Sequence, residues 1–208
     1  MRITKETDMT MASKTLREVA GLGQETARLA ESALIMIDVQ NTYRSGLMQL
    51  TGVEAAVLEA RKLLALARDL NIPIFHIRHD AGAGSPYDTQ AESGAICKEV
   101  APIDGEPVIT KNYPNAFFNT DLDQQLKAAN IKNIVLAGFM THMCVNSTAH
   151  GGFNLGYGVT VVASATASRP LLAANGKVLG AQEVHDGAIA STRDLYATIA
   201  DTVADVKL

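Results

Sequence analysis

Apolar residues along this chain fall into short continuous runs separated by longer segments with helical spacing. The run at 33–37 is apolar at every position, which is typical of a parallel strand buried on both faces. Similar runs predict further strands at 72–77, 107–110, 131–138 and 159–163.

Between these strands, apolar residues recur every three or four positions, which predicts helices that pack through one side. One such helix spans 53–70, and a second spans 144–155 and stops at Gly156. A third lies behind Thr120-x-x-Asp123, which resembles a capping box. The last predicted helix carries an apolar side formed by Val184, Ala188, Thr192, Leu195, Ile199 and Val203.

Strands that alternate with helices imply right-handed crossovers and a mostly parallel sheet covered on both faces. We therefore expect an α/β protein with three layers, α/β/α. Residues 1–32 show little strand signal and are interpreted as an N-terminal extension that packs on the domain or on a neighbouring subunit. The domain itself is expected to span 33–208, because no repeat or linker divides it.

Composition and charge narrow the classes of partner. Apolar residues make up 47% of the 208 residues, and a net charge of -4 with scattered basic residues argues against nucleic acid. No apolar run approaches the roughly 20 residues that cross a bilayer, and the N-terminus lacks the plan of a signal peptide. Because two cysteines cannot form a disulfide framework, we expect a cytoplasmic protein with no membrane partner.

Polar residues gather where the predicted strands end. In parallel sheets, ligands bind at the carboxyl ends of the strands. Asp38, His79, Lys111 and the loop at 138–144 each follow a predicted strand directly. A long loop at 78–104 adds to this picture, since loops of that length inside compact domains are usually functional. The sequence therefore predicts a site at this edge of the sheet.

Cys144 is the candidate nucleophile. We expect it at a helix N-terminus, where unpaired N–H groups and the helix dipole favour the thiolate. Asp38 would act as the base and Lys111 as a cation beside both. Each residue also has a structural interpretation that involves no catalysis. Cys144 could be a buried thiol, Asp38 a hydrogen-bond acceptor for its loop and Lys111 a solvated ammonium. Because all three residues are expected at the same edge of the sheet, a catalytic role is favoured. Cys97 does not stand between a predicted strand and a helix in this way and is interpreted as structural.

His76, His79 and Asp80 raise the question of a metal site. The two histidines stand three positions apart along a predicted strand, so their rings should face opposite sides of the sheet. We therefore expect no metal and no cofactor, and interpret His79 as a hydrogen-bonding group of the pocket.

Three blocks of sequence carry a resemblance to a known family. They read Ala-Leu-Ile-Met-Ile-Asp-Val-Gln-Asn at 33–41, Gly-Glu-Pro-Val-Ile-Thr-Lys at 105–111 and Gly-Phe-Met-Thr-His-Met-Cys-Val-Asn-Ser-Thr-Ala at 138–149. Together they resemble the isochorismatase-like cysteine hydrolases, a superfamily that includes nicotinamidases and N-carbamoylsarcosine amidohydrolases. The order and spacing of the blocks make the resemblance specific, and it extends from residue 33 to about residue 203.

The resemblance implies the isochorismatase-like hydrolase fold and a catalytic triad of Asp38, Lys111 and Cys144. It also implies a cis peptide bond between Phe139 and Met140. Such a bond would aim the backbone N–H groups of Met140 and Cys144 at one point and so form an oxyanion hole. Small amides, imides or ureides are the substrates that the resemblance implies, and a dimer or tetramer is the implied assembly.

Two departures from the family pattern narrow the choice. The metal-binding cluster of the nicotinamidases is not evident after Arg78, which argues against a metal-assisted mechanism. The isochorismatases that cleave a vinyl ether lack a cysteine at the position of Cys144, so this residue favours C–N bond hydrolysis.

The expected substrate-binding residues are Gln40, Tyr43, His79, Phe117 and His142. For Phe117 and Tyr43 an alternative to a place in the pocket is packing, in the core for Phe117 and at an interface for Tyr43.

The sequence thus predicts an amidohydrolase that cleaves a C–N bond of a small molecule through a thioester on Cys144. Asp38 would take the thiol proton and donate it to the leaving nitrogen. Three alternatives stay open: isochorismatase-type hydrolysis, a thiol redox or sensor role, and metabolite binding without catalysis. A redox role is disfavoured, because no resolving cysteine stands near Cys144.

Overall fold

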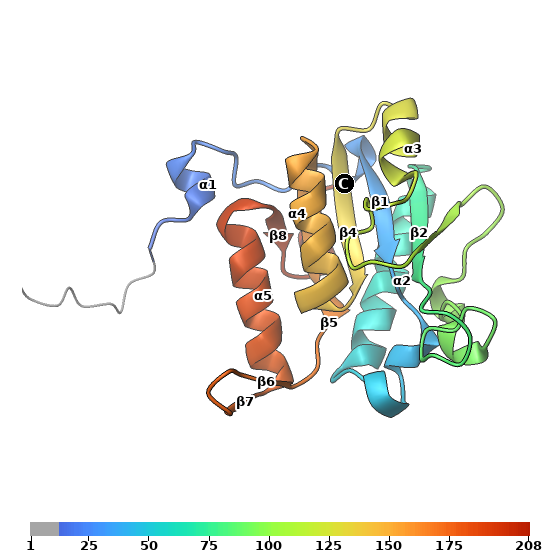
Figure 1. Ribbon diagram of the computed structural model, residues 1–208. Helices are drawn as coiled ribbons and strands as arrows, with labels where there is room; N and C mark the ends of the chain where they lie inside the picture. The colour runs from blue at the N-terminus through green and yellow to red at the C-terminus, as the bar shows by residue number, and fades with distance from the viewer. Residues whose placement is uncertain (1–12) are drawn as a thin grey trace, which may run out of the picture.

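A six-stranded parallel sheet with the order β3-β2-β1-β4-β5-β8 forms the centre of the molecule (Figure 1). The computed structural model describes residues 13–208. In chain order the strands are β1 (Ser32–Ile37), β2 (Ile74–His79), β3 (Val108–Lys111), β4 (Asn133–Phe139), β5 (Gly158–Ala167) and β8 (Thr198–Ala200). The expected α/β class with a mostly parallel sheet is confirmed.

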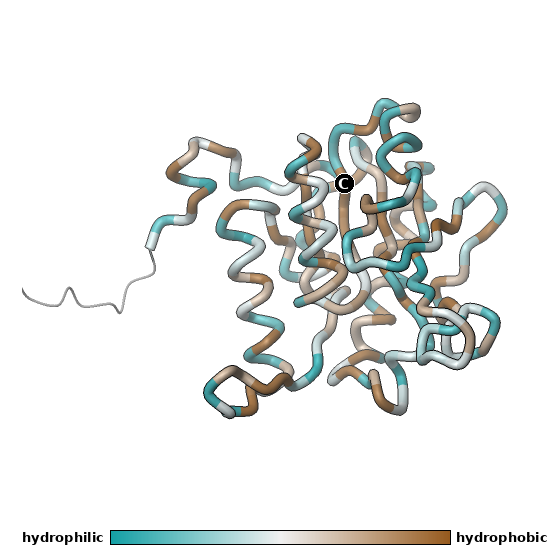
Figure 2. Tube along the Cα trace, in the orientation of Figure 1, coloured by the Kyte–Doolittle hydropathy of each residue, from teal (hydrophilic) through white to brown (hydrophobic). Residues whose placement is uncertain are grey.

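Helices cover both faces of this sheet. The long helix α2 lies behind it in Figure 1, and α3, α4 and α5 lie in front. Their bounds are Val53–Asp69 for α2, Leu122–Ala128 for α3, Asn146–Asn154 for α4 and Ala181–Leu195 for α5. In Figure 2 the strands between the two layers are drawn mostly in beige and brown, towards the hydrophobic end of the scale, whereas the helices alternate between teal and brown.

Strand β1 shows how the sequence produces this arrangement. Successive side chains of a strand point to opposite faces. Leu34 and Met36 accordingly join the apolar cluster that packs against α2, and Ile35 and Ile37 join the cluster that packs against α3 and α4. A strand that is apolar at every position is therefore what a sheet covered on both faces requires.

The largest difference from the predicted elements lies near the C-terminus. Helix α5 ends at Leu195, whereas Ile199 lies in β8 and pairs with Val161 of β5. Val203 belongs to a short 3-10 turn. The prediction of one continuous helix through Val203 is wrong, because a strand of three residues is too short to show an alternating pattern of its own.

The predicted capping box before α3 is also wrong. Asp121 occupies the N-cap, and its side chain makes no capping hydrogen bond. The Thr120 hydroxyl instead donates a hydrogen bond of 2.6 Å to the carbonyl oxygen of Ala116. The Thr120 oxygen also accepts a long hydrogen bond of 3.4 Å from the N–H of Leu122, but it does so from the position before the N-cap, so no capping box forms.

Part of the predicted N-terminal extension packs against the end of the domain. The short helix α1 (Leu16–Val19) lies beside α5, where the N–H of Leu16 donates to Asp194 Oδ1 at 3.0 Å. Arg17 Nη1 donates to the carbonyl oxygen of Leu195 at 2.8 Å. The extension's first residues, 1–12, lie outside the described residues. Within 13–208, no helix has both the length and the apolar character to cross a membrane.

Candidate active site

Three side chains from distant parts of the chain meet at the carboxyl end of the sheet. Asp38 follows β1, Lys111 is the last residue of β3, and Cys144 lies in the turn after β4. The Lys111 ammonium lies 2.6 Å from Asp38 Oδ2 and donates a hydrogen bond of 3.3 Å to Cys144 Sγ. All three residues are buried, with Cys144 the most exposed at 5%.

The sheet order explains why a lysine occupies the end of β3. Strand β2 lies between β3 and β1, so a side chain on β3 must reach past one whole strand to contact Asp38. Neighbouring strands are about 4.8 Å apart, and the four-carbon stem of lysine suits that reach. Asp38 itself adopts a left-handed conformation with φ of 48°, which aspartate tolerates better than most residues.

The exit from β4 places the cysteine. Gly138 has φ of 120°, and a Cβ there would lie 1.9 Å from the carbonyl oxygen of Ile37, so only glycine fits against β1. The peptide bond between Phe139 and Met140 is cis. A π-helical turn, Thr141–Val145, follows, and α4 begins only at Asn146. Cys144 therefore lies inside this turn, two residues before the helix that was expected to begin with it.

The protonation of the thiol differs from the expectation. Burial and the nearby Asp38 carboxylate raise the pKa of Cys144 to about 12, and Lys111 only partly offsets them. The resting group is thus a thiol at neutral pH, and the expected helix-stabilised thiolate is wrong. Burial also raises the pKa of Asp38, again with Lys111 opposing, which makes Asp38 a stronger base than an exposed aspartate.

His79 extends the same cluster. Its Nδ1 lies 3.2 Å from Lys111 Nζ, and burial together with the Lys111 charge lowers the pKa of the ring. A neutral ring accepts a hydrogen bond from the ammonium at Nδ1 and carries its proton at Nε2. The interpretation of His79 as a hydrogen-bonding group beside the catalytic candidates agrees with this geometry.

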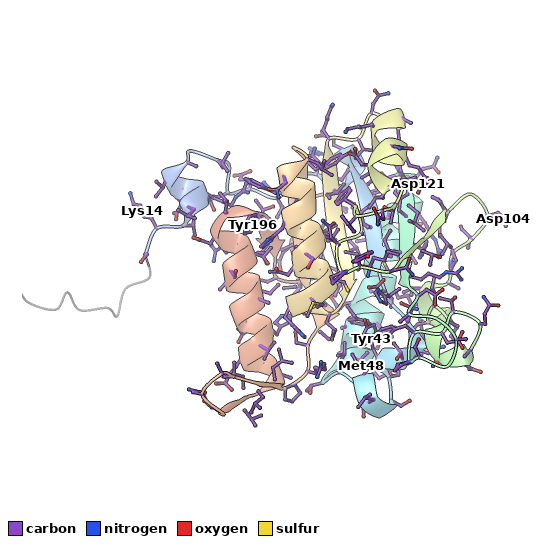
Figure 3. The ribbon with its side chains drawn as sticks, in the orientation of Figure 1. Lys14, Tyr43, Met48, Asp104, Asp121 and Tyr196 are labelled. Carbon is purple, nitrogen blue, oxygen red and sulfur yellow. The ribbon has the colours of Figure 1, made fainter. Side chains whose placement is uncertain are left out.

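Two tyrosines lie next to this cluster. The ring of Tyr43 packs edge to face against Phe139 at 5.4 Å and against Tyr87 at 5.8 Å, and Tyr87 meets His79 at 5.0 Å. Figure 3 shows Tyr43 at the end of the sheet where the arrow of β1 ends in Figure 1. The sequence does not mark Tyr87 as a site residue, because a tyrosine in a long loop has no periodicity that reveals its neighbours.

Gln40 and Phe117 do not have the places expected of substrate-binding residues. The Gln40 side chain donates to the carbonyl oxygens of His79 and Gly94 and accepts from the His79 N–H, so its amide serves as a structural brace. Phe117 stacks on Tyr157 at 5.7 Å, near the amino ends of β4 and β5 and thus at the opposite edge of the sheet. Packing in the core therefore describes Phe117 better than a place in the substrate pocket.

The remaining polar candidates occupy separate places in the fold. His142 is in the π-helical turn, and its Nδ1 lies 3.1 Å from Ser168 Oγ. His76 points away from His79 and contacts Glu106 at 2.9 Å, as expected for rings on opposite faces. Cys97 is fully buried, and burial raises its pKa to about 11. Within residues 13–208, no three His, Cys, Asp or Glu side chains gather in a group able to hold a metal ion.

Comparisons with known proteins agree with the fold and the blocks described above. The family model for the isochorismatase domain matches residues 32–203. An uncharacterized isochorismatase family protein of Bacillus subtilis is 36% identical over 85% of this chain and 99% of its own length. The maleamate amidohydrolase of Pseudomonas putida is 34% identical over 71% of this chain and 77% of its own length. The crystal structure of an isochorismatase from Pseudomonas putida superposes with a TM-score of 0.89 at 34% identity, covering 93% of this chain and 99% of that one.

Proposed function

The chain belongs to the isochorismatase family of hydrolases, and we propose that it cleaves a C–N bond of a small amide, imide or ureide through a thioester on Cys144. One observation carries the proposal. The buried Lys111 ammonium contacts both the Asp38 carboxylate and the Cys144 sulfur, so a nucleophile, a base and a cation share one small volume. That amidohydrolases are among the similar proteins supports the choice of bond.

The acylation half begins from the protonated thiol. Asp38 accepts the proton as the sulfur attacks the substrate carbonyl carbon, and the carbonyl oxygen takes up the negative charge. The backbone N–H groups of Met140 and Cys144 are the proposed donors to this oxyanion. When the tetrahedral intermediate collapses, the C–N bond breaks, the nitrogen receives the proton from Asp38, and a thioester remains on Cys144.

The deacylation half repeats the same transfers with water. Asp38 accepts a proton from water as the water oxygen attacks the thioester carbon, and the acid product forms when the C–S bond breaks. The departing sulfur regains its proton from Asp38, which restores the resting state. The Lys111 ammonium stabilises whichever neighbour, carboxylate or sulfur, is negative at each stage.

The pair of cysteines in this chain offers a matched test. Cys144→Ala is expected to lower ammonia release from a panel of small amides by at least about 10³-fold, because the nucleophile is lost. Cys97→Ala removes the other buried thiol, which lies away from the cluster, and is expected to keep the wild-type rate. Full activity of Cys144→Ala would refute the thioester route.

Further measurements on the wild-type protein and on Cys144→Ala distinguish the proposed function from the other candidate roles. Reversible sulfenylation of Cys144 by mild peroxide, with no ammonia release from any amide, would instead support a redox or sensor protein. Ligand-dependent thermal stabilisation of wild type and Cys144→Ala alike, without turnover, would support a metabolite-binding protein.

A further inference from the structure

A chain of hydrogen bonds connects α5 to the turn that carries Cys144. His185 Nδ1 lies 3.0 Å from Thr141 Oγ1, and the Thr141 hydroxyl donates to Thr166 Oγ1 at 3.0 Å. The Thr166 hydroxyl in turn donates to the carbonyl oxygen of Ala163 at 2.9 Å. The chain thus joins helix α5, the π-helical turn and strand β5.

The direction of these bonds fixes the proton on His185. A carbonyl oxygen only accepts, so the single hydroxyl proton of Thr166 is committed to Ala163. Thr141 must then donate its own proton to Thr166. Its oxygen is left to accept from His185, which requires that Nδ1 carries a proton.

This chain of hydrogen bonds anchors the start of the turn, and the contact of His142 with Ser168 is a second side-chain link between the turn and the rest of the fold. Thr141 directly follows the cis peptide bond and precedes Cys144 by three residues. Within the turn, the N–H groups of Met143 and Val145 both donate to the same carbonyl oxygen, that of Met140. Thr141 and Thr166 are 2% and 5% exposed, so water does not readily replace a lost partner there.

We propose that His185 is a positioning residue for the reaction: by donating from Nδ1 to Thr141, it fixes the turn that aims the Met140 and Cys144 backbone and holds the Cys144 sulfur beside Lys111. This inference rests on the proposed function for its kinetic consequence, and its structural part stands without it. His185 acts through Thr141 and touches none of the reacting atoms.

The electrostatic surroundings agree with a neutral ring. Burial lowers the pKa of His185, and only its neighbour Asp186 opposes this. At neutral pH the ring therefore carries one proton, and Thr141 determines which nitrogen holds it.

Nitrogen NMR of the histidine side chains tests the structural part independently of any substrate. The chain has five histidines, and the His185 signals are those lost in His185→Asn. The proposal expects the neutral His185 ring to carry its proton on Nδ1. A proton on Nε2 would overturn it, because Thr141 would then have to donate to the ring and could not also donate to Thr166.

Two amide substitutions provide a matched kinetic test. The side-chain nitrogen of asparagine reaches the position of Nδ1, whereas that of glutamine reaches the position of Nε2. His185→Gln is expected to lower kcat by about 10-fold, the cost of one lost buried hydrogen bond, with little change in KM. His185→Asn is expected to recover most of the rate. The rate of carboxymethylation of Cys144 should likewise be lower in His185→Gln than in His185→Asn. This rate reports on the sulfur without the need for an amide substrate.

Thr141 completes the test through a double-mutant cycle. Thr141→Val removes the acceptor for His185, so adding His185→Gln to it should cause little further loss of kcat or of Cys144 alkylation rate. Additive losses would overturn the proposal, as would equal rates for His185→Gln and His185→Asn. If the wild-type protein hydrolyses no amide, the proposed function fails, while the tautomer and the alkylation rates still decide the role of His185.

Discussion

The ammonium of Lys111 lies 2.6 Å from Asp38 Oδ2, although both side chains are fully buried. Within residues 13–208, neither Asp38 oxygen has a well-aligned hydrogen bond, so this ion pair is the main compensation for burying the carboxylate. Removing one partner of a buried pair leaves the other charge unpaired, which typically costs about 3–5 kcal/mol. The pair should therefore matter for folding as well as for catalysis.

Lys111→Met is accordingly expected to lower the free energy of unfolding by about 3–5 kcal/mol and to abolish amide hydrolysis. The double variant Lys111→Met, Asp38→Asn should recover part of the stability, because no buried charge is left, but none of the activity. Urea unfolding at pH 7 measures the first effect. If the double variant is less stable than Lys111→Met alone, unpaired charge is not the cause of the loss.

The pH dependence of Cys144 reactivity follows from two buried groups, the Asp38 carboxyl and the Cys144 thiol itself. Asp38 accepts the thiol proton only when it is ionised, and burial raises its pKa above the ordinary value of 3.8. Carboxymethylation of Cys144 should therefore fall on acidification, with an inflection above pH 3.8. Because the pKa of the thiol is about 12, no second rise is expected near pH 8.5, where free thiols ionise.

Asp38→Asn serves as the control for this profile. It should remove the acidic inflection, since no carboxylate remains beside the sulfur to titrate in that range. A wild-type profile that simply rises through pH 8.5 would show instead that the sulfur ionises without help from Asp38.

Gly138→Ala tests the close approach of β4 to β1. A Cβ there would lie 1.9 Å from the carbonyl oxygen of Ile37, at a φ of 120° that alanine rarely adopts. We expect a loss of at least about 3 kcal/mol of stability, together with loss of activity. Gly187→Ala, in the open face of α5 with nothing within 4 Å of the added carbon, should keep or raise the melting temperature. Equal melting temperatures for the two variants would contradict the account.

Glu106 is expected to stabilise the fold away from the site. Burial opposes its ionisation, but hydrogen bonds from Arg68 and His76 lower its pKa to about 2. A carboxyl group with a depressed folded-state pKa contributes stability above its unfolded value of 4.5, and loses it as the pH falls towards 2. Glu106→Gln should cost on the order of 2 kcal/mol at pH 7.

The pH dependence of that cost identifies its origin. The difference between wild type and Glu106→Gln should shrink steadily in urea unfolding curves recorded from pH 5 down to pH 3. The exposed Glu92→Gln should leave stability unchanged at every pH. A cost for Glu106→Gln that is independent of pH would indicate packing rather than ionisation.

How well the sequence predicts each element depends on how many neighbouring residues carry its hydrophobic pattern. The continuous apolar run of β1 and the helical spacing over α2 are long local patterns, and the structure reproduces both elements within a few residues. The three residues of β8 carry too little pattern to be found. For Asp38, Lys111 and Cys144, one geometric rule was sufficient, because residues after parallel strands share an edge of the sheet.

The rest of the site depends on contacts that no local pattern encodes. Gln40 follows β1 closely, yet its amide is committed to the backbone of the 78–104 loop, whose path the sequence does not specify. The protonation of Cys144 was misjudged for a similar reason. Helix position alone suggested a thiolate, whereas burial beside Asp38 determines the pKa. His185 was equally hidden, since its partner Thr141 lies 44 residues away in the sequence.

Peptide mass spectrometry of protein quenched with acid during turnover of an amide tests the central claim most directly. We expect an acyl group, equal in mass to the substrate minus its leaving amine, on the peptide that contains Cys144 and not on the one that contains Cys97. The adduct should disappear once the substrate is consumed. An acyl group on another residue, or undiminished ammonia release by protein whose Cys144 is fully carboxymethylated, would contradict it.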